Sequence, residues 1–256
     1  MQAKEYRLNQ QRVVIAADAD ALYQIAVNRI IETAHAAVRD RGAFHLALSG
    51  GSTPRRLHQL LAEPVNQQQI EWNKVHVYFG DERNVPHDHP DSNFRMAMET
   101  LLTRVPVPPS QIHGMPTGCD DMQACADRYA QVLETLPQRY GLPCFDLILL
   151  GMGDDGHTAS LFPGTSILSE QHRTVAAVYV PKLSCWRISL TYPVINQANV
   201  IMVLVSGESK SDMLFKVMNE PVHEFPIQGI NKEHLEWYVD TSAARRLVES
   251  DVGISG

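Results

Sequence analysis

The sequence of 256 residues contains no long hydrophobic run. Its longest apolar stretch, at 200–205, is far shorter than the ~20 residues that a helix needs to span a bilayer. The N-terminal segment MQAKEYRLNQQ also lacks the apolar core of a secretory signal. We therefore expect a cytoplasmic protein without a membrane partner.

Cysteine is scarce as well. The four cysteines, Cys119, Cys125, Cys144 and Cys185, include no C-x-x-C pair, which argues against a structural zinc site and against a disulfide framework. We expect these side chains to be reduced and partly buried.

Basic residues are fewer than acidic ones. Lysine and arginine number 22 against 29 aspartates and glutamates, which gives a formal net charge of −7. Nucleic acids and anionic membranes bind basic surfaces, so this balance disfavours both as partners. If the ligand is an anion, the cations that bind it must be gathered locally.

Internal repeats, low-complexity tracts and charge blocks are also missing, and no shift in composition marks a domain boundary. Hydrophobic residues make up 44% of the chain and charged residues 20%, both ordinary values for a globular protein. The sequence therefore predicts a single domain over residues 1–256, and it leaves open whether the protein is a monomer or a small homo-oligomer.

The sequence does have a regular alternation of apolar runs and helical patterns. Apolar runs that predict strands lie at 12–17, 44–48, 74–79, 145–150, 174–180, 187–191, 199–205 and 236–240. Helical patterns lie at 20–39, 54–62, 93–102, 122–136 and 210–218, and a short helix follows the last strand. Strands separated by helices of this length predict an α/β fold with a mostly parallel sheet and helices on both faces.

Four of the apolar runs end in small, polar or charged segments. These segments are SGGST at 49–53, GDERN at 80–84, GMGDDGH at 151–157 and SGESK at 206–210. The carboxyl ends of parallel strands lie at one edge of a sheet, where open α/β proteins hold their ligands. We therefore expect the four loops to converge on one site.

The SGGST segment has the composition of a phosphate-binding loop. Thr53 is a good helix N-cap and Pro54 suits the first helical position, while Gly50 and Gly51 let backbone N–H groups approach an anion at the start of that helix. No G-K-[S/T] follows, so a nucleoside triphosphate is not expected. The alternative is a tight turn without a ligand.

Gly151, Gly153 and Gly156 match the G-x-G-x-x-G pattern of dinucleotide-binding loops. In such loops the third glycine packs within a helix of ordinary length, but here Pro163 follows Gly156 by only seven residues. Two carboxylates of the loop would also face the pyrophosphate. We therefore expect no nicotinamide or flavin cofactor and interpret the loop as the support of His157.

His157 has the chemistry of a general base. Histidine titrates near neutrality, so a neutral imidazole at this edge can accept a proton from water, and Asp155 lies two residues before it. If a short helix starts at Thr158, its positive end keeps the ring neutral. The alternative is a structural or merely exposed histidine, the role left for others such as His35 and His223.

The other loops supply cations and one carboxylate. Arg83 is able to donate two hydrogen bonds to a phosphate, and Asp81 is able to accept one from a hydroxyl. The alternative is a solvated loop without a ligand, because this composition is common in such loops. Lys210 lies near a helix start, where a bound anion would offset the unfavourable macrodipole; the alternative is a lysine that folds back to Glu208. Arg187 is either an edge residue of a strand or a further cation for the ligand.

A cluster of His87, Asp88, His89 and Asp91 resembles a metal site at first sight. Its spacing is not that of a dedicated metal site, and Ser92 is better explained as the N-cap of the following helix. We expect no metal in this loop.

Taken together, these segments resemble the 6-phosphogluconolactonase family. The matching pieces run in order over nearly the whole chain: LSGGSTP, FGDERNVPHDHPDSNFRMA, FDLILLGMGDDGHTASLFPGT, RISLTYPVINQA, VSGESKSDML and PIQGINKEHLEWYVDTSAA. The resemblance implies a modified Rossmann-like sheet shared with glucosamine-6-phosphate deaminases and ribose-5-phosphate isomerases. It also implies hydrolysis of 6-phospho-D-glucono-1,5-lactone to 6-phosphogluconate without a metal or another cofactor.

The residues then receive the following roles as hypotheses. His157 is the general base and Asp155 orients it. The phosphate is bound by Ser49, Gly50, Gly51, Ser52, Thr53, Arg83 and Lys210, and the rest of the substrate by Asp81, Gly153 and Arg187. The family's tail commonly reads P-A-x-x-(I/V), from which Pro226-Ile227-Gln228 departs.

Two rivals remain. Glucosamine-6-phosphate deaminases continue from G-D-G-H toward an Asn-Glu-Pro segment whose glutamate assists ring opening, whereas residues 158–163 here read TASLFP. A sugar-phosphate sensor, as in some transcriptional regulators of similar fold, would have a helix-turn-helix before the sheet, and none precedes it here.

Overall fold

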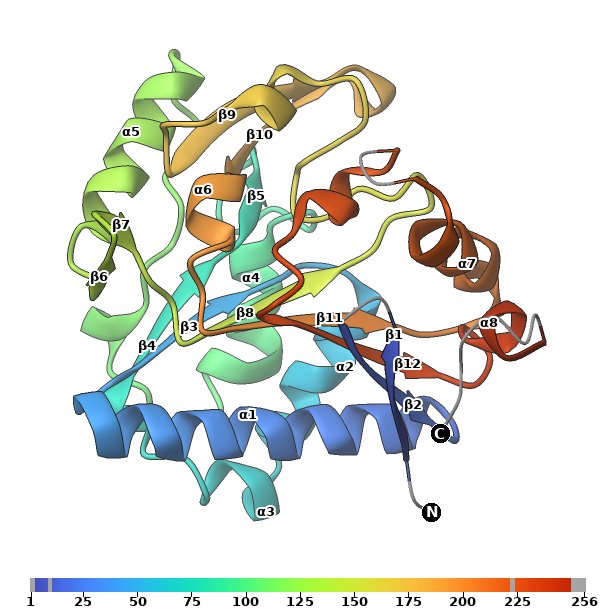
Figure 1. Ribbon diagram of the computed structural model, residues 1–256. Helices are drawn as coiled ribbons and strands as arrows, with labels where there is room; N and C mark the ends of the chain where they lie inside the picture. The colour runs from blue at the N-terminus through green and yellow to red at the C-terminus, as the bar shows by residue number, and fades with distance from the viewer. Residues whose placement is uncertain (1–2, 9–10, 222–223, 250–256) are drawn as a thin grey trace.

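Seven strands form the main sheet, in the order β1-β2-β12-β11-β8-β3-β4 (Figure 1). The computed structural model describes residues 3–8, 11–221 and 224–249, so His223 lies outside the described residues. The strands of the main sheet are β1 (Lys4–Leu8), β2 (Gln11–Ala16), β3 (Phe44–Leu48), β4 (Val75–Phe79), β8 (Leu147–Gly151), β11 (Val200–Val205) and β12 (Leu235–Asp240). All neighbours from β2 to β4 in this order run parallel, and β1, which the sequence analysis missed, is antiparallel to β2. The mostly parallel sheet is confirmed.

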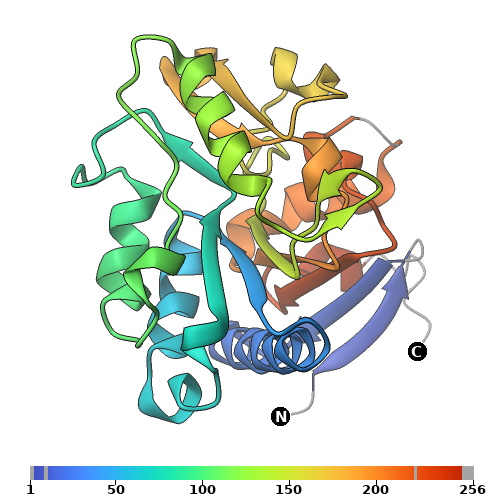
Figure 2. The ribbon, with the colours of Figure 1, turned by 90° about the vertical axis from the view of Figure 1, so that its left-hand side faces the viewer.

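Helices connect these strands and pack on both sides of the sheet. They are α1 (Ala19–Arg41), α2 (Ser52–Leu61), α3 (Pro64–Gln67), α4 (Asn93–Ala97), α5 (Met122–Leu133), α6 (Tyr192–Ile195), α7 (Ser211–Asn219) and α8 (Arg245–Glu249). Figure 1 shows α1 below the sheet and α6 above it, and Figure 2 shows α1 nearly end-on. None of the helices in the described ranges combines the length and apolar character needed to cross a membrane.

Local sequence explains where the helices begin and end. The side chain of Asp18 accepts a hydrogen bond from the Ala21 N–H at 2.8 Å, and Gly42 ends α1 with a φ of 80°. The predicted N-cap Ser92 is confirmed, because its Oγ accepts from the N–H of Arg95 at 3.1 Å. The helix from Asn93 continues as a π-helix over Met98–Leu102.

Two predicted strands do not belong to the main sheet. β9 (Val175–Val180) and β10 (Cys185–Leu190) pair antiparallel with each other, and β10 also pairs with β5 (Asp81–Arg83), so the three form a separate sheet. Residues 181–184 are too few for the crossover that two parallel strands require, and they form a hairpin instead. A further pair, β6 (Gln138–Arg139) and β7 (Leu142–Pro143), makes a two-stranded ribbon.

The expectation that all four cysteines are reduced is wrong. Cys119 and Cys125 form a disulfide, with Cα atoms 6.1 Å apart. Asp121 caps α5 by accepting from the N–H groups of Gln123 and Ala124, so the chain turns back at this point and Cys119 lies against the first turns of the helix. Two cysteines separated by five other residues match no recognised motif, which is why the spacing gave no signal. Cys144 and Cys185 are free.

Candidate active site

One cleft at the carboxyl edge of the main sheet joins the four predicted loops. Its lining includes residues 49–54 after β3, residues 151–154 and 157–159 after β8, and residues 204–206 at the end of β11. Of the predicted site residues, the following line it: Ser49, Gly50, Gly51, Ser52, Thr53, Asp81, Arg83, Gly153, His157, Arg187 and Lys210. Asp155 does not line the cleft, but its carboxylate contacts the His157 ring. The convergence of the loops is therefore confirmed.

The imidazole of His157 contacts Phe162, Gly153 and Asp155. The ring stacks on Phe162, with centroids 4.0 Å apart and an angle of 21° between the planes. A Cβ atom at Gly153 would lie 2.0 Å from Nδ1 of His157, so only glycine leaves room for the ring. Nδ1 itself lies 2.5 Å from Oδ1 of Asp155.

The charge of Asp155 decides which nitrogen of the ring carries the proton. Burial opposes ionisation of this carboxyl, but hydrogen bonds from Lys182 and His157 outweigh it and lower the pKa of Asp155 to about 2. A carboxylate accepts hydrogen bonds, so Nδ1 must donate. When the ring is neutral, Nε2 therefore carries the lone pair, which is the tautomer that a base at this position requires.

No helix starts at Thr158, so the condition considered for His157 is not met. Thr158 and Leu161 instead form an isolated bridge around a turn, and Ala159 adopts a φ of 47°. The buried Ser160 donates through Oγ to Asp81 Oδ2 at 2.7 Å, which ties the turn to the neighbouring loop. Asp155, rather than a helix dipole, therefore determines the tautomer of the neutral imidazole.

The helix after the SGGST segment, α2, begins earlier than predicted. Gly51, with a φ of 106°, is the N-cap of α2, so Thr53 is not the cap and Pro54 is the third helical residue. Glycine at this position lets the chain turn sharply from the strand into the helix. No side chain caps the helix, and its first residues, Ser52 and Thr53, line the cleft. Their N–H groups have no intrahelical acceptors.

Three cations surround the same cleft. Arg83 donates from Nη1 to the Asp91 carbonyl at 2.6 Å, and its Nε is buried without a hydrogen-bond partner in the described part of the chain. Lys210 donates to Asp154 at 2.5 Å rather than folding back to Glu208. Arg187 is a cleft residue with only 11% of its side chain exposed, not a solvent-facing edge residue.

The model of the family described as glucosamine-6-phosphate isomerases/6-phosphogluconolactonase matches residues 17–239. The chain belongs to this family. A 6-phosphogluconolactonase from Nostoc sp. is 37% identical over 242 residues, which cover 92% of this chain and 98% of that relative. Another from Synechocystis sp. is 41% identical over 216 residues, 82% of this chain and 88% of the relative.

Solved structures of the family share the fold. A 6-phosphogluconolactonase from Trypanosoma cruzi superposes with a TM-score of 0.81 at 29% identity, covering 96% of this chain and 99% of that one. A monomeric glucosamine-6-phosphate deaminase gives a TM-score of 0.76 at 22% identity, covering 91% and 98%. The fold that the resemblance implied, including its relation to the deaminases, is confirmed.

Sequence reasoning missed one residue, Asn93, that joins the loops of this cleft. Asn93 donates from Nδ2 to the carbonyl and the carboxylate of Asp81, at 2.9 and 3.1 Å. A Cβ atom at Gly50 would collide with the same Asn93 side chain, at 1.8 Å. Asp81 also faces Arg187, with 3.6 Å between Oδ2 and Nη1. The one available signal was the helix start at Ser92, which placed Asn93 at the front of α4.

A second missed residue, Lys182, contacts Asp155 from the hairpin between β9 and β10. Its Nζ lies 2.8 Å from Oδ2 of Asp155. The sequence predicts strands 174–180 and 187–191 in the parallel sheet. It therefore does not predict that residues 181–184, which connect them, lie next to the GMGDDGH loop.

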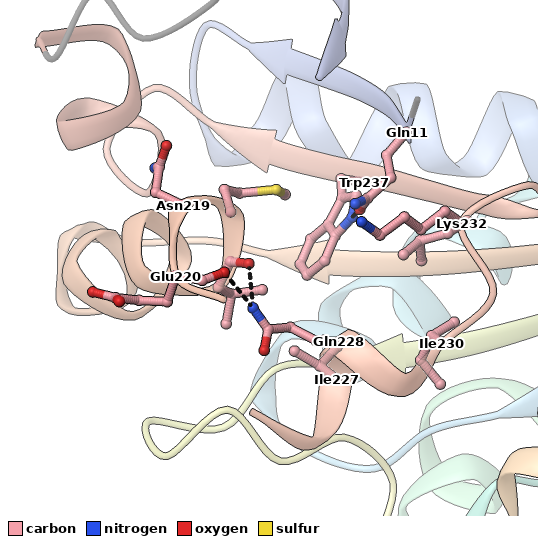
Figure 3. Close-up of a pocket in the computed structure, with 11 residues that line it drawn as sticks. Gln11, Asn219, Glu220, Ile227, Gln228, Ile230, Lys232 and Trp237 are labelled. Carbon is pink, nitrogen blue, oxygen red and sulfur yellow. Dashed lines mark hydrogen bonds between the residues drawn. The ribbon is translucent and has the colours of Figure 1, made fainter. Parts of the chain in front are cut away.

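Residues 226–228, which depart from the family's tail pattern, pack beside the GMGDDGH loop. The N–H of Ile227 donates to the Gly156 carbonyl at 3.0 Å. Gln228 donates from Nε2 to the carbonyl oxygens of Val217 and Glu220, which ties the tail to the end of α7 (Figure 3). The crevice drawn in Figure 3 is lined in part by these residues and lies apart from the four loops. The Gln228 side chain therefore anchors the tail next to α7.

The described residues contain no group of three or more His, Cys, Asp or Glu side chains arranged to hold a metal ion. In the segment considered for metal binding, His87 bonds the Met115 carbonyl at 2.8 Å, and His89 accepts from the Asp91 N–H at 3.1 Å. Both side chains are thus used within the fold.

Proposed function

We propose that this protein hydrolyses 6-phospho-D-glucono-1,5-lactone to 6-phospho-D-gluconate, the lactonase step of the oxidative pentose phosphate pathway. The observation that carries the proposal is the imidazole of His157, held by an ionised Asp155 at the rim of a cleft that also contains cations and a helix N-terminus. Relatives from Nostoc sp. and Synechocystis sp. bear the name of this activity.

The phosphate of the substrate is the handle that positions it. The uncapped start of α2 offers backbone N–H groups and the positive end of the helix to an anion. The unpartnered Nε of Arg83 and the ammonium of Lys210 add charge on the other sides of the same cleft. Binding of the phosphate here releases Lys210 from the exposed Asp154 and presents the lactone ring to His157.

His157 then acts on water. Nε2 removes a proton as the water oxygen attacks C1 of the lactone, and the carbonyl electrons move to the carbonyl oxygen. Arg187, which lies over the Phe162 ring that His157 stacks on, is the cation we assign to this oxyanion. When the tetrahedral intermediate collapses, the bond from C1 to the ring oxygen breaks and His157 returns the proton to that oxygen.

The energetic requirement is modest. A positioned general base supplies about 10²–10⁴-fold, which is adequate for an activated ester that already hydrolyses in water. The proposal therefore contains no metal and no covalent enzyme intermediate. We further propose that residues 1–256 act as one domain and that the reaction takes place in the cytoplasm.

The test is proton release after addition of the phosphorylated lactone. We expect wild-type protein to acidify the medium faster than the enzyme-free reaction, and His157→Ala to lose about 10²–10⁴-fold in kcat with KM little changed. His172→Ala, a substitution at an exposed histidine outside the cleft, is the matched control. Ammonia release from glucosamine 6-phosphate would identify a deaminase instead, and binding of the sugar phosphate without turnover would identify a sensor.

A further inference from the structure

The carboxylate of Asp155 is held at both of its oxygens. Oδ1 accepts from Nδ1 of His157 at 2.5 Å, and Oδ2 accepts from Nζ of Lys182 at 2.8 Å. We propose that Lys182 is a positioning residue for the lactonase reaction, because it fixes Asp155 in the orientation that leaves Nε2 of His157 free to accept a proton. This inference rests on the proposed role of His157 and deepens it.

The backbone around Lys182 is fixed by a tight hairpin turn. Val180 and Cys185 are paired across the hairpin, and Pro181–Leu183 form a 3-10 turn between them. The N–H of Ser184 donates to the Pro181 carbonyl at 3.1 Å, and Ser184 takes the left-handed φ of 49° that closes the turn. Pro181 limits the backbone further. The lysine therefore extends from a constrained base toward the loop at 154–157.

The ion pair has one shielded and one exposed partner. Only 22% of the Asp155 side chain is exposed, against 65% of the Lys182 side chain. Both residues line a hollow together with apolar groups of Phe162, Val180 and Pro181. Water screens the charge of the exposed lysine, so its main contribution is the hydrogen bond that orients the carboxylate.

The charged groups that face the Asp155–His157 pair are few and have separate partners. The neighbouring Asp154, 79% exposed, binds Lys210, which we assign to the substrate phosphate. Arg187 approaches across the Phe162 ring and is assigned to the carbonyl oxygen. Lys182 is the cation among them whose described hydrogen bond goes to Asp155 alone. It therefore serves the base rather than the substrate.

Loss of the lysine has two consequences for the reaction. Without a donor at Oδ2 the carboxylate is free to rotate, so Nδ1 loses its fixed acceptor and the ring populates both neutral tautomers. The negative charge of Asp155 is also no longer offset, and it favours the imidazolium, which cannot accept a proton from water. Both effects lower the fraction of enzyme with an available base.

The experiment compares Lys182→Met with Lys182→Arg in the full-length protein. We expect Lys182→Met to lower kcat by about 10-fold to 10²-fold with KM unchanged, because the substrate contacts remain while the base is misplaced. The acid limb of its pH profile should move to higher pH. Lys182→Arg should recover most of the activity. Lys74→Met, which removes an exposed lysine at the start of β4, is the charge-matched control and should behave as wild type.

A second readout does not depend on turnover. Nitrogen-15 NMR of the histidine rings should show the Nδ1–H tautomer for His157 in wild type and a mixture of tautomers in Lys182→Met. If wild type hydrolyses the lactone but Lys182→Met keeps its kcat, pH profile and tautomer, the inference about Lys182 is wrong while the proposed function stands. A fall in kcat that Lys182→Arg does not restore, with an unchanged tautomer, would indicate a purely structural role and also overturn it. If wild type fails to hydrolyse the lactone, the proposed function itself fails.

Discussion

The replacement Asp155→Asn tests the catalytic arrangement sharply, because Lys182 dictates how the new amide is oriented. An ammonium requires an acceptor, so the amide oxygen of the asparagine should turn toward Lys182, in the place of Oδ2. The amide NH₂ then faces Nδ1 of His157, which must become the acceptor. The proton moves to Nε2, and the ring nitrogen directed at water is no longer basic.

The expected loss follows from what the base contributes. Removal of general-base assistance costs about 10²–10⁴-fold in kcat, or about 3–5 kcal/mol at ~1.36 kcal/mol for each factor of ten. Asparagine has nearly the shape of aspartate and Asp155 does not line the cleft, so KM should hardly change. Asp155→Ala should be less damaging, because its ring is free to adopt either tautomer and a fraction of the molecules keeps Nε2 unprotonated.

The assay is proton release in weak buffer with a pH indicator, from which the enzyme-free rate is subtracted. Asp127→Asn, which changes an exposed aspartate paired with Arg173, is the matched control. The double variant Asp155→Asn with Lys182→Met should be faster than Asp155→Asn alone, since the amide is then free to turn its oxygen toward Nδ1. If Asp155→Asn proves more active than Asp155→Ala, the orientation argument is refuted.

Two further predictions concern the loop and the fold. In Gly153→Ala the new Cβ would lie 2.0 Å from Nδ1 of His157, so the ring must move; we expect kcat to fall by about 10²-fold with an unchanged circular dichroism spectrum, and wild-type kcat would contradict this. Burial would raise the pKa of Glu236, but hydrogen bonds from Arg29 and Tyr238 outweigh it and hold this pKa below the ordinary 4.5. Such a carboxylate stabilises the fold above its unfolded pKa and loses this effect as pH falls, so Glu236→Gln should cost about 2 kcal/mol in urea unfolding at neutral pH. A cost that stays constant down to about pH 3 would contradict this account.

The cleft could be predicted from sequence because its signals are local. Each of the runs at 44–48, 145–150 and 199–205 is apolar and passes directly into a glycine-containing loop, so both the strand and its carboxyl end are visible in one stretch of sequence. Parallel topology then places those ends at one edge. Most of the predicted site residues therefore line the cleft, although Asp155 does not.

What the sequence could not supply depends on contacts between distant segments. The hairpin of β9 and β10 brings Lys182 to Asp155, 27 residues earlier in the chain, and no local pattern reports such a contact. A short helix from Thr158 was equally open from the sequence. The buried hydrogen bond from Ser160 to Asp81 favours a turn there instead. In both places a contact between distant segments decides the local structure.

The G-x-G-x-x-G pattern shows how a motif can describe backbone geometry without identifying a ligand. Its glycines indicate that some group approaches the backbone closely, and here that group is the imidazole of His157. Two N–H groups of the loop are already used inside it, since Gly153 donates to the His157 carbonyl at 2.8 Å and Gly156 donates to the Gly153 carbonyl at 3.1 Å. Neither is free to bind an anion, whereas α2, which begins in the same cleft, has no side-chain cap among the described residues. In the proposed function, one glycine-rich loop therefore positions the base and the other binds the phosphate.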